Sequence, residues 1–329
     1  FDFTFLQNRL TFCADIFERK VTDILIPGGK DYPALIGDDN LPFENAGVLK
    51  TTGFELQAKW SDKLSNGFAY SVGVALSDDK AEVLSYPSNP TNKIGDGVLY
   101  KGYTVGDIWG YETGGILQES DFDGVGPNGK PLYHGAYFKG GQPYPGYVWY
   151  QDLDHDGVIT SGLSTVDDPG DKKVIGNNAP RYRYNITANF QYKGFDLDLM
   201  FQGVGKRDYW LKDVSSYWGG GAGSWETYNQ SWTPERTDAK FPMYGSGIGS
   251  YAQSGYLLDA SYIKLKQVIL GYTFPKALIG KVGLEKLRLN IAAYNLFTLS
   301  DVPKYYDSDY LSDAYPPKRT FSVGIQVGF

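Results

Sequence analysis

The last nine residues, Phe321 to Phe329, read FSVGIQVGF and alternate without exception. Each odd-numbered residue is apolar and each even-numbered one is small or polar, which is the two-residue period of a β-strand with one apolar face. Terminal residues fray unless something holds them. A sheet that closes on itself would hold this strand, because its last strand has a neighbour on each side and can turn its apolar row towards lipid. We therefore expect long, one-faced strands joined alternately by short turns and long loops.

The composition agrees with a β architecture. The chain of 329 residues holds 27 Tyr, 7 Trp and 41 Gly but only 2 His and 2 Met, a profile typical of aromatic girdles and tight turns. No stretch approaches the roughly 18 consecutive apolar residues of a membrane-spanning helix. The net charge of −7, without a long basic run, argues against a nucleic-acid partner. Cys13 stands alone, so no intrachain disulfide can form.

The same alternation recurs along the chain. The ranges that read as strands are 1–6, 10–24, 48–60, 68–76, 181–192, 195–201, 262–273, 287–294 and 321–329. In 262–273 the apolar positions change face, which predicts a bulge near Lys266. Residues 274–283 hold the one segment that reads as a short helix. Because the first range looks like a strand already under way, we expect the sheet to begin elsewhere.

The connections between these strands sort by length. Those at 7–8, 61–66, 193–194 and 274–284 are short, and those at about 26–44, 78–179, 206–259 and 299–317 are long. Since the two kinds alternate, all long loops lie at one end, as in outer-membrane barrels with long exterior loops. A soluble sandwich also alternates apolar and polar residues, but its strands are usually ~5 to 6 residues and its loops do not sort by length. The pattern favours part of a transmembrane antiparallel β-barrel.

Four separated segments also carry a family resemblance. They are Gly102–Gln118, Asp152–Gly203, Tyr262–Phe297 and the terminal YPPKRTFSVGIQVGF. In this order they resemble the carboxy-terminal barrel of SusC-like TonB-dependent transporters of the outer membrane of Bacteroidetes. The resemblance implies a barrel of about 22 strands, of which this chain holds about nine, with an amino-terminal plug, energy from TonB and a SusD-like surface lipoprotein as partner. The plug and the TonB-contacting segment have no counterpart in this chain.

The segment DLDHDGVIT, residues 152–160, matches a calcium-binding loop. Carboxylates at positions one, three and five, Gly at six, a carbonyl at seven and a hydroxyl at nine suit an oxygen cage for Ca²⁺. The predicted ligands are Asp152, Asp154, Asp156, the carbonyl of Val158 and Thr160. Position twelve is Leu163, so a bidentate acid would have to come from Asp167, Asp168 or Asp171. The alternative is an Asp-rich turn without a metal.

Aromatic rings in the long loops predict a binding surface. The residues predicted to contact a ligand or a lid are Trp109, Trp149, Tyr150, Trp218, Trp225 and Trp232. Such rings stack on sugar faces or contact peptide side chains at a small entropic cost. The alternative is that they pack the loops onto one another or onto a lipoprotein.

Catalytic motifs are weak. His134 and His155 lie in one long loop, and Cys13 lies in a predicted strand with no base nearby in sequence. The run GVGPNGK, residues 124–130, matches a dinucleotide fingerprint literally, but no strand leads into it and Pro127 occupies the helix start, so it reads as a turn. We expect no enzyme.

The function implied by the resemblance is TonB-dependent import of an oligomeric nutrient across the bacterial outer membrane. A glycan is favoured over a peptide, and the partners are a SusD-like lipoprotein, the TonB complex and outer-membrane lipid. The alternative is a passive pore, or a surface glycan-binding β protein without energy coupling. A plug and a TonB-contacting segment ahead of Phe1 would separate the two.

Overall fold

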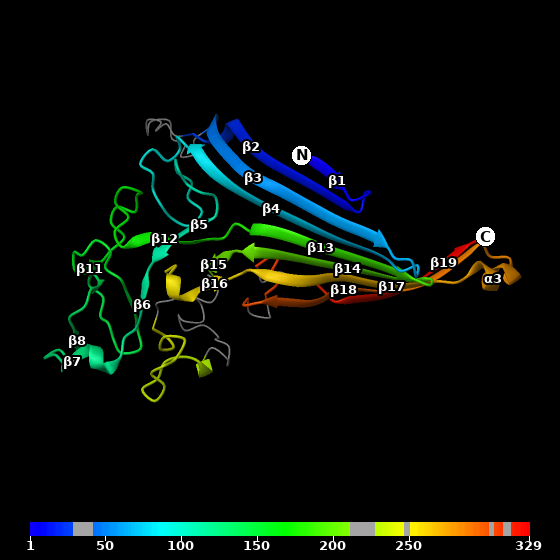
Figure 1. Cartoon of the computed structure of the whole chain (residues 1–329). Helices are drawn as coiled ribbons and strands as arrows, with labels where there is room; N and C mark the ends of the chain where they lie inside the picture. Colours follow the sequence, from blue (N-terminus) through cyan, green and yellow to red (C-terminus); the bar gives the residue numbers. More distant parts are fainter. Residues whose placement is uncertain (29–41, 211–227, 247–250, 303–305, 312–316) are drawn as a thin grey trace.

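The computed structural model describes residues 1–28, 42–210, 228–246, 251–302, 306–311 and 317–329. Its main feature is one antiparallel sheet of nine strands in chain order (Figure 1). The strands are β1 (Asp2–Phe5), β2 (Leu10–Pro27), β3 (Phe43–Lys63), β4 (Ala69–Ser85), β13 (Arg181–Tyr192), β14 (Phe195–Lys206), β17 (Tyr262–Thr273), β18 (Lys286–Ser300) and β19 (Thr320–Gly328). All nine predicted strands are thus present.

The register gives the sheet two different faces. Ile186 on β13 lies opposite Val74 on β4 and Phe201 on β14, and further apolar residues continue the row across the sheet. We call this side the apolar face. On the other side, the polar face, Asn189 lies opposite Ser71 and Asp198. Because side chains alternate between the faces of a strand, this register exposes a continuous apolar surface that suits lipid.

Aromatic rings gather where the connections between strands are short. Ring contacts link Phe3 with Phe5 and Phe12, Phe68 with Tyr70, Phe190 and Tyr192, and Phe195 with Tyr272. The Trp60 indole N–H donates to the Tyr70 hydroxyl oxygen at 3.2 Å. Such a belt is typical of a membrane–water interface. We call this side of the sheet the short-turn end.

An ion pair crosses three strands on the polar face. Arg288 on β18 donates to Asp196 on β14, with Nε 3.1 Å from Oδ1. Gly271 on β17 lies between them, and a Cβ there would collide with both side chains. The glycine is therefore required by the close approach of the two charged groups.

Two predicted irregularities are confirmed. The pairing skips Lys266 on both sides of β17, where Gln267 and Leu265 are consecutive partners for β14 and β18, which is the expected bulge. The predicted helix is a single turn, α3 (Lys276–Ile279), followed by the 3₁₀ turn η5 (Gly280–Val282).

The predicted loop boundaries are wrong at the opposite side, the long-loop end. The loop expected from residue 78 starts later, because β4 continues to Ser85, and the loop expected from 299 starts after Ser300. On β4 the positions that continue the apolar face change from Leu76 to Asp78 and Lys80, while backbone pairing with β3 continues. The hydrophobic period therefore ends before the strand does.

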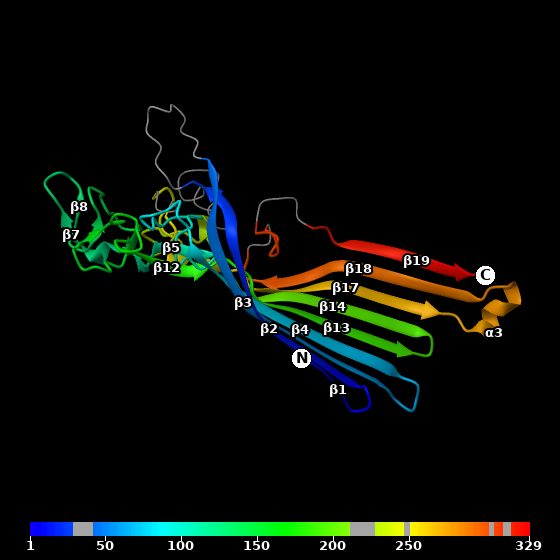
Figure 2. The same ribbon diagram turned by 90° about the horizontal axis from the view of Figure 1, so that it is seen from above.

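The long connections contain small elements that the sequence pattern did not predict. Five two-stranded sheets form there: β5 (Asp107–Tyr111) with β12 (Lys172–Asn177), β6 (Thr113–Ile116) with β10 (Val148–Tyr150), β7 (Phe122–Val125) with β8 (Pro131–Tyr133), β9 (Tyr137–Phe138) with β11 (Val158–Ile159), and β15 (Asp208–Trp210) with β16 (Leu257–Asp259). The 3₁₀ turns η2 (Glu119–Asp121) and η4 (Ser254–Tyr256) complete them. They gather beyond one end of the main sheet (Figures 1 and 2).

The two edges of the nine-stranded sheet stay apart. Within the described residues β1 pairs with β2 alone and β19 with β18 alone, so the expected second neighbour of the last strand is not among them. Figure 2 shows the curved sheet with β1 at one edge and β19 at the other. Among the same residues, no helix is long and apolar enough to cross a membrane.

The two faces predict opposite responses to charge. Ile186→Arg places a guanidinium on the apolar face and should lower the free energy of unfolding by about 2 to 4 kcal/mol, as charges at the middle of lipid-facing barrel surfaces do. Thr187→Arg, one residue on, points to the polar face and should be nearly neutral. Urea unfolding of the full-length protein in micelles measures both. Equal losses would contradict the assignment of the faces.

Candidate binding surfaces at the long-loop end and on the polar face

The first long connection has an aromatic core of its own. Tyr111, Val148, Tyr150 and Ile159 are buried together, with Phe138 packed against them. The ring centroids of Tyr111 and Tyr150 are 5.2 Å apart. Burial raises the pKa of Tyr150, and its hydroxyl lies inside the core without a hydrogen-bond partner among the described residues. The structure therefore places Tyr150, a predicted ligand or lid contact, inside the aromatic core of this connection.

Two of the predicted tryptophans also pack inside the loops. The Trp109 indole N–H donates to the Tyr100 hydroxyl oxygen at 3.0 Å, in a second core that contains Tyr103. Trp232 is 3% exposed, and its indole N–H donates to Gln118 Oε1 at 2.9 Å. That bond joins residues 228–246 to the preceding long connection. The positions of these two rings match the alternative that the tryptophans pack the loops onto one another.

Trp149 is partly exposed, as is Trp109, but no hydrogen bond of its indole N–H is described. It lies against Gly114, where a Cβ would collide with the indole, so the glycine allows the ring to lie flat on β6. Trp218 and Trp225 lie outside the described residues. A ligand or lid contact stays a prediction for Trp149 and for these two.

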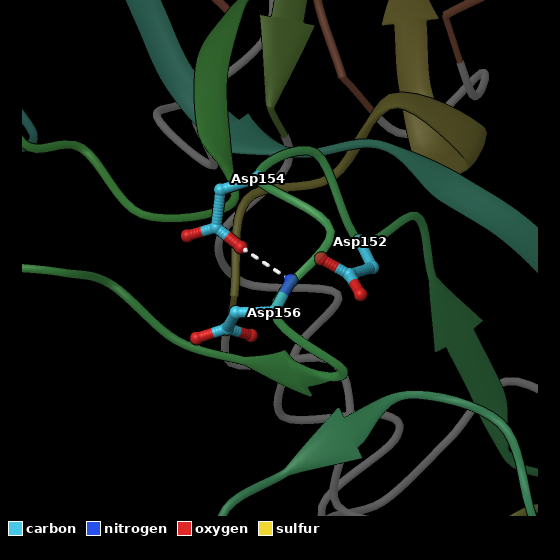
Figure 3. A group of neighbouring side chains, drawn as sticks. All are labelled: Asp152, Asp154 and Asp156. Carbon is cyan, nitrogen blue, oxygen red and sulfur yellow. Dashed lines mark hydrogen bonds between the residues drawn. The ribbon is translucent and has the colours of Figure 1, made fainter.

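The predicted calcium loop brings its three carboxylates together. One oxygen from each of Asp152, Asp154 and Asp156 lies within 4.8 Å of the others. Figure 3 shows the carboxylates around a single turn of backbone, with the N–H of Asp156 donating to Asp154 Oδ1 at 3.2 Å. The N–H of Gly157 donates to Asp152 Oδ2 at 2.9 Å, and a left-handed conformation at Gly157, with φ of 84°, closes the turn.

Among the described residues, no Lys, Arg or His side chain forms an ion pair or hydrogen bond with these three carboxylates. Asp152 Oδ1 is buried and has no hydrogen-bond partner among the described residues. Burial alone would raise the pKa of Asp152, but the N–H of Gly157 and adjacent backbone donors hold it below its usual value. Burial and the neighbouring carboxylates of Asp171 and Asp156 raise the pKa of Asp154. An orphaned oxygen among repelling carboxylates fits a divalent cation.

Asp171 occupies a role that the spacing could not assign. Its side chain is fully buried, and its two oxygens accept the N–H groups of Leu153 at 2.8 Å and Thr160 at 2.7 Å. The carboxylate thus ties both ends of the loop together across the insertion. Asp168 instead accepts the N–H of Leu163 at 3.2 Å. The sequence named both as acids that could follow the loop, but only the fold shows which one closes it.

The polar face carries a cavity of about 470 Å³ near the long-loop end. Asp15 and Glu55 line it from β2 and β3, and Arg183 and Arg207 line it from the side of β13 and β14. Asp309 also lines the cavity beside Arg207, so acidic and basic groups are both present in its wall. Such a cavity is able to hold a polar or charged chain.

A buried ion pair fastens the last long connection beside this cavity. Lys264 on β17 is 2% exposed, and its Nζ lies 2.7 Å from Asp309 Oδ2 and 3.1 Å from Asp307 Oδ2. The Tyr262 hydroxyl also donates to Asp309. Nearby, the Tyr209 hydroxyl donates to the Leu311 carbonyl at 2.6 Å. Sequence reasoning missed this cluster, because its bonded partners are more than 40 residues apart and share no motif.

Comparison with known proteins identifies relatives over the whole chain. No protein-family model matches the sequence. TonB-dependent receptor P3 of Formosa agariphila is 27% identical over 356 residues, covering 100% of this chain and 33% of the relative. TonB-dependent receptor SusC of Bacteroides thetaiotaomicron is 24% identical over 347 residues, covering 100% and 31%. The chain therefore spans about a third of the length of the curated relatives it matches.

Solved structures show the same fold. The structure of the RagAB peptide transporter matches with a TM-score of 0.71 at 20% identity, covering 98% of this chain and 34% of that chain. The RagAB peptide importer in its "open-open" state matches with a TM-score of 0.70 at 21% identity, covering 98% and 33%. The resemblance to SusC-like TonB-dependent transporters is confirmed, and with it the antiparallel barrel fold and the outer-membrane location. The relatives' names, those of receptors and transporters, fit the expectation of no enzyme.

The buried ion pair allows a matched test. Lys264→Met leaves Asp307 and Asp309 without their cation and should destabilise the protein by about 3 to 5 kcal/mol. Lys266→Met is the control, because Lys266 is 37% exposed and 4.0 Å from Asp309, and an exposed pair contributes about 0 to 1 kcal/mol. Urea unfolding of the full-length protein measures both, and equal effects would contradict the role given to Lys264.

The same pair predicts a pH dependence. Burial alone would raise the pKa of Asp309, but the bonds from Lys264 and Tyr262 hold it below its ordinary value. The stabilisation is therefore present above the ordinary carboxyl pKa of about 4 and is lost as the pH falls through the lower folded value. The difference in unfolding free energy between wild type and Lys264→Met should shrink in that acidic range. A difference that persists there would contradict the ionic origin.

Proposed function

We propose that this chain supplies the carboxy-terminal strands of a transporter that imports an oligomeric nutrient across the outer membrane with energy from TonB. One observation carries the proposal: a sheet of eight long strands and the short β1, with one apolar face, ends at one side only in a mass of loops with their own cores. Loops of that size are seldom kept unless they carry function. In the proposed orientation they face the exterior.

The proposed partner is a SusD-like lipoprotein that rests on these loops and traps the ligand against the barrel. Supporting it, the apolar side chains of Val125, Leu132 and Leu163 and the ring of Tyr251 are exposed at the long-loop end, and apolar residues gathered at a surface mark interfaces. A stable contact of this kind buries well above ~1,000 Å².

The ligand class is proposed as a glycan or a peptide. The sequence favoured a glycan because of the loop tryptophans, but Trp232 is buried and Trp109 is bonded inside a loop core. The cavity is lined by acidic and basic side chains, Asp15 and Glu55 as well as Arg183 and Arg207, which suits a chain that carries charge. A protein similar in fold is named a peptide transporter, which supports testing both classes.

We also propose that residues 152–160 hold Ca²⁺ in the ligand set predicted above. The orphaned Oδ1 of Asp152 and the convergence of three carboxylates support it. Ile159, next to the predicted ligand Thr160, is buried in the aromatic core of the loop. A bound ion would therefore stabilise that core, and Asp171 would hold the loop in the binding conformation.

Uptake by cells of the source bacterium tests the transport proposal. Deletion of the complete gene should abolish uptake of one class in a panel of labelled oligosaccharides and oligopeptides. Inactivation of the TonB system should abolish the same uptake, since a plugged barrel needs energy. Uptake that survives without TonB would favour the passive pore.

Co-purification tests the lid. Replacing residues 211–256 by a short turn keeps β15 paired with β16 but removes most of the second large connection. The lipoprotein should then be lost from detergent-solubilised complexes, whereas replacement of residues 29–41, in another long connection, should leave it bound. Unchanged partners after the first replacement would contradict the capture model.

Calcium titration tests the loop. The full-length protein should gain resistance to thermal unfolding in millimolar Ca²⁺, with a dissociation constant of about 10⁻⁴ to 10⁻³ M, as in exposed extracellular sites. Asp152→Ala with Asp154→Ala should remove the gain. Asp123→Ala, at an exposed acid of the same connection that is not among the predicted ligands, is the control. A gain that the double variant retains would mean that the ion binds elsewhere.

A further inference from the structure

The last long connection folds back onto the polar face of the sheet. Gln202, which shares its side of β14 with Asp198 of the polar face, is the cross-strand partner of Lys264 on β17. Because Lys264 is the residue that binds Asp309, residues 306–311 lie against the polar face. We call this segment the 306–311 turn. The polar face of a closed barrel borders its lumen, so the turn lies inside the mouth of the barrel.

Several independent contacts hold the 306–311 turn against that wall. Nη1 of Arg207 donates to the Asp309 carbonyl at 3.2 Å, and the Tyr209 hydroxyl donates to the Leu311 carbonyl at 2.6 Å. Leu311 is 3% exposed and packs in a small core with Val302. Since hydrogen bonds, an ion pair and an apolar contact would all have to break before the turn could leave the wall, it is a fixed part of the mouth.

The backbone of the turn is held in a strained form. Leu311 has φ of 49°, in the left-handed region that a leucine rarely adopts. Its N–H donates to the Asp307 carbonyl at 2.8 Å, and the Asp309 N–H donates to Asp307 Oδ1 at 2.9 Å. Such a conformation persists only where surrounding contacts impose it, and it is concentrated at functional sites. The contacts that impose it here fix the direction of the residue between Asp309 and Leu311.

That residue is Tyr310, whose side chain is 70% exposed. Both of its neighbours in sequence are tied to the wall, Asp309 through Lys264 and Leu311 through its small core. The ring of Tyr310 therefore projects away from the wall into the lumen. Asp309 also lines the cavity of about 470 Å³ on the polar face, which places the ring beside that cavity. An exposed ring on a fixed turn contacts a ligand at a small entropic cost.

We propose that Tyr310 is a ligand-contact residue, whose ring packs against a flat face of low polarity on a chain that passes through the mouth. The CH face of a sugar ring and an apolar side chain of a peptide both offer such a face. The charged and amide side chains of the neighbouring cavity wall then contact the polar part of the same chain. This inference rests on the proposed function, because it takes the lumen as the path of the ligand.

Thiol labelling tests the position of Tyr310 without any ligand. In the full-length transporter with Cys13→Ser, Tyr310→Cys is compared with Val125→Cys, in the β7–β8 hairpin, where Val125 is 68% exposed. A small maleimide should label both. A maleimide joined to a large polyethylene glycol should label Val125→Cys fully and leave Tyr310→Cys largely unlabelled, because the barrel wall and the loops exclude it. Equal labelling by the large reagent, or no labelling of Tyr310→Cys by the small one, would overturn the placement in the lumen.

Ligand retention tests the contact itself. The full-length transporter in micelles is incubated with a library of linear oligosaccharides or with a library of linear oligopeptides, and retained molecules are counted by mass spectrometry. Tyr310→Ala should lower retention from one of the two libraries by about two- to tenfold, the range of a single aromatic contact. The library that responds identifies the ligand class. Tyr310→Phe keeps the ring and should retain as much as wild type.

Tyr192→Ala is the matched control, because Tyr192 is 38% exposed on the apolar face at the short-turn end and should not affect retention. Equal retention by wild type and Tyr310→Ala, including no retention by either, overturns the ligand contact. A loss with Tyr310→Phe as large as with Tyr310→Ala overturns the role of the ring. Because neither measurement involves TonB, a failure here leaves TonB-dependent uptake standing, and a failure of that uptake leaves these results unchanged.

Discussion

Backbone hydrogen bonding in lipid is the constraint on which this architecture depends. Hydrocarbon offers no partner for an N–H or a carbonyl, so strands that border it must pair with neighbours along their full length. Pairing then fixes the register, and the register puts Ile186 beside Val74 and Phe201 rather than beside Asn189. Because a one-residue slip would exchange the faces, the alternation along each strand is strong enough to be read from the sequence.

Alternation predicted the strands whose two faces meet different environments, one apolar and one polar. It did not predict strands whose faces are alike. All nine strands and the bulge at Lys266 follow from alternation. Beyond the lipid, β4 continues to Ser85 although Asp78 and Lys80 have replaced the apolar row, because pairing with β3 needs no apolar face. The small sheets of the long connections were likewise invisible, since strands of a few residues leave almost no period to detect.

The candidate sites differ in the same way, because some are formed by residues that are close in the sequence and others by residues that are far apart. The calcium loop is a motif of consecutive residues, so its three converging carboxylates could be predicted from spacing. Asp171 closes that loop through backbone donors, and Lys264 binds Asp309 from another strand, and neither relation has a sequence signature. The tryptophans show the limit of composition: a ring such as Trp232 is equally suited to a surface and to a loop core.

The buried contacts bear on how the loops act. Trp232 bonds to Gln118 across the two largest connections, and Lys264 holds the last connection against β17. Since each such bond would have to break before its loop could move independently, these loops present a largely preformed surface. A partner that docks on a preformed surface spends little free energy on ordering it. In the proposed capture mechanism, movement then belongs to the partner, and the loop cores act as the fixed seat of the lid.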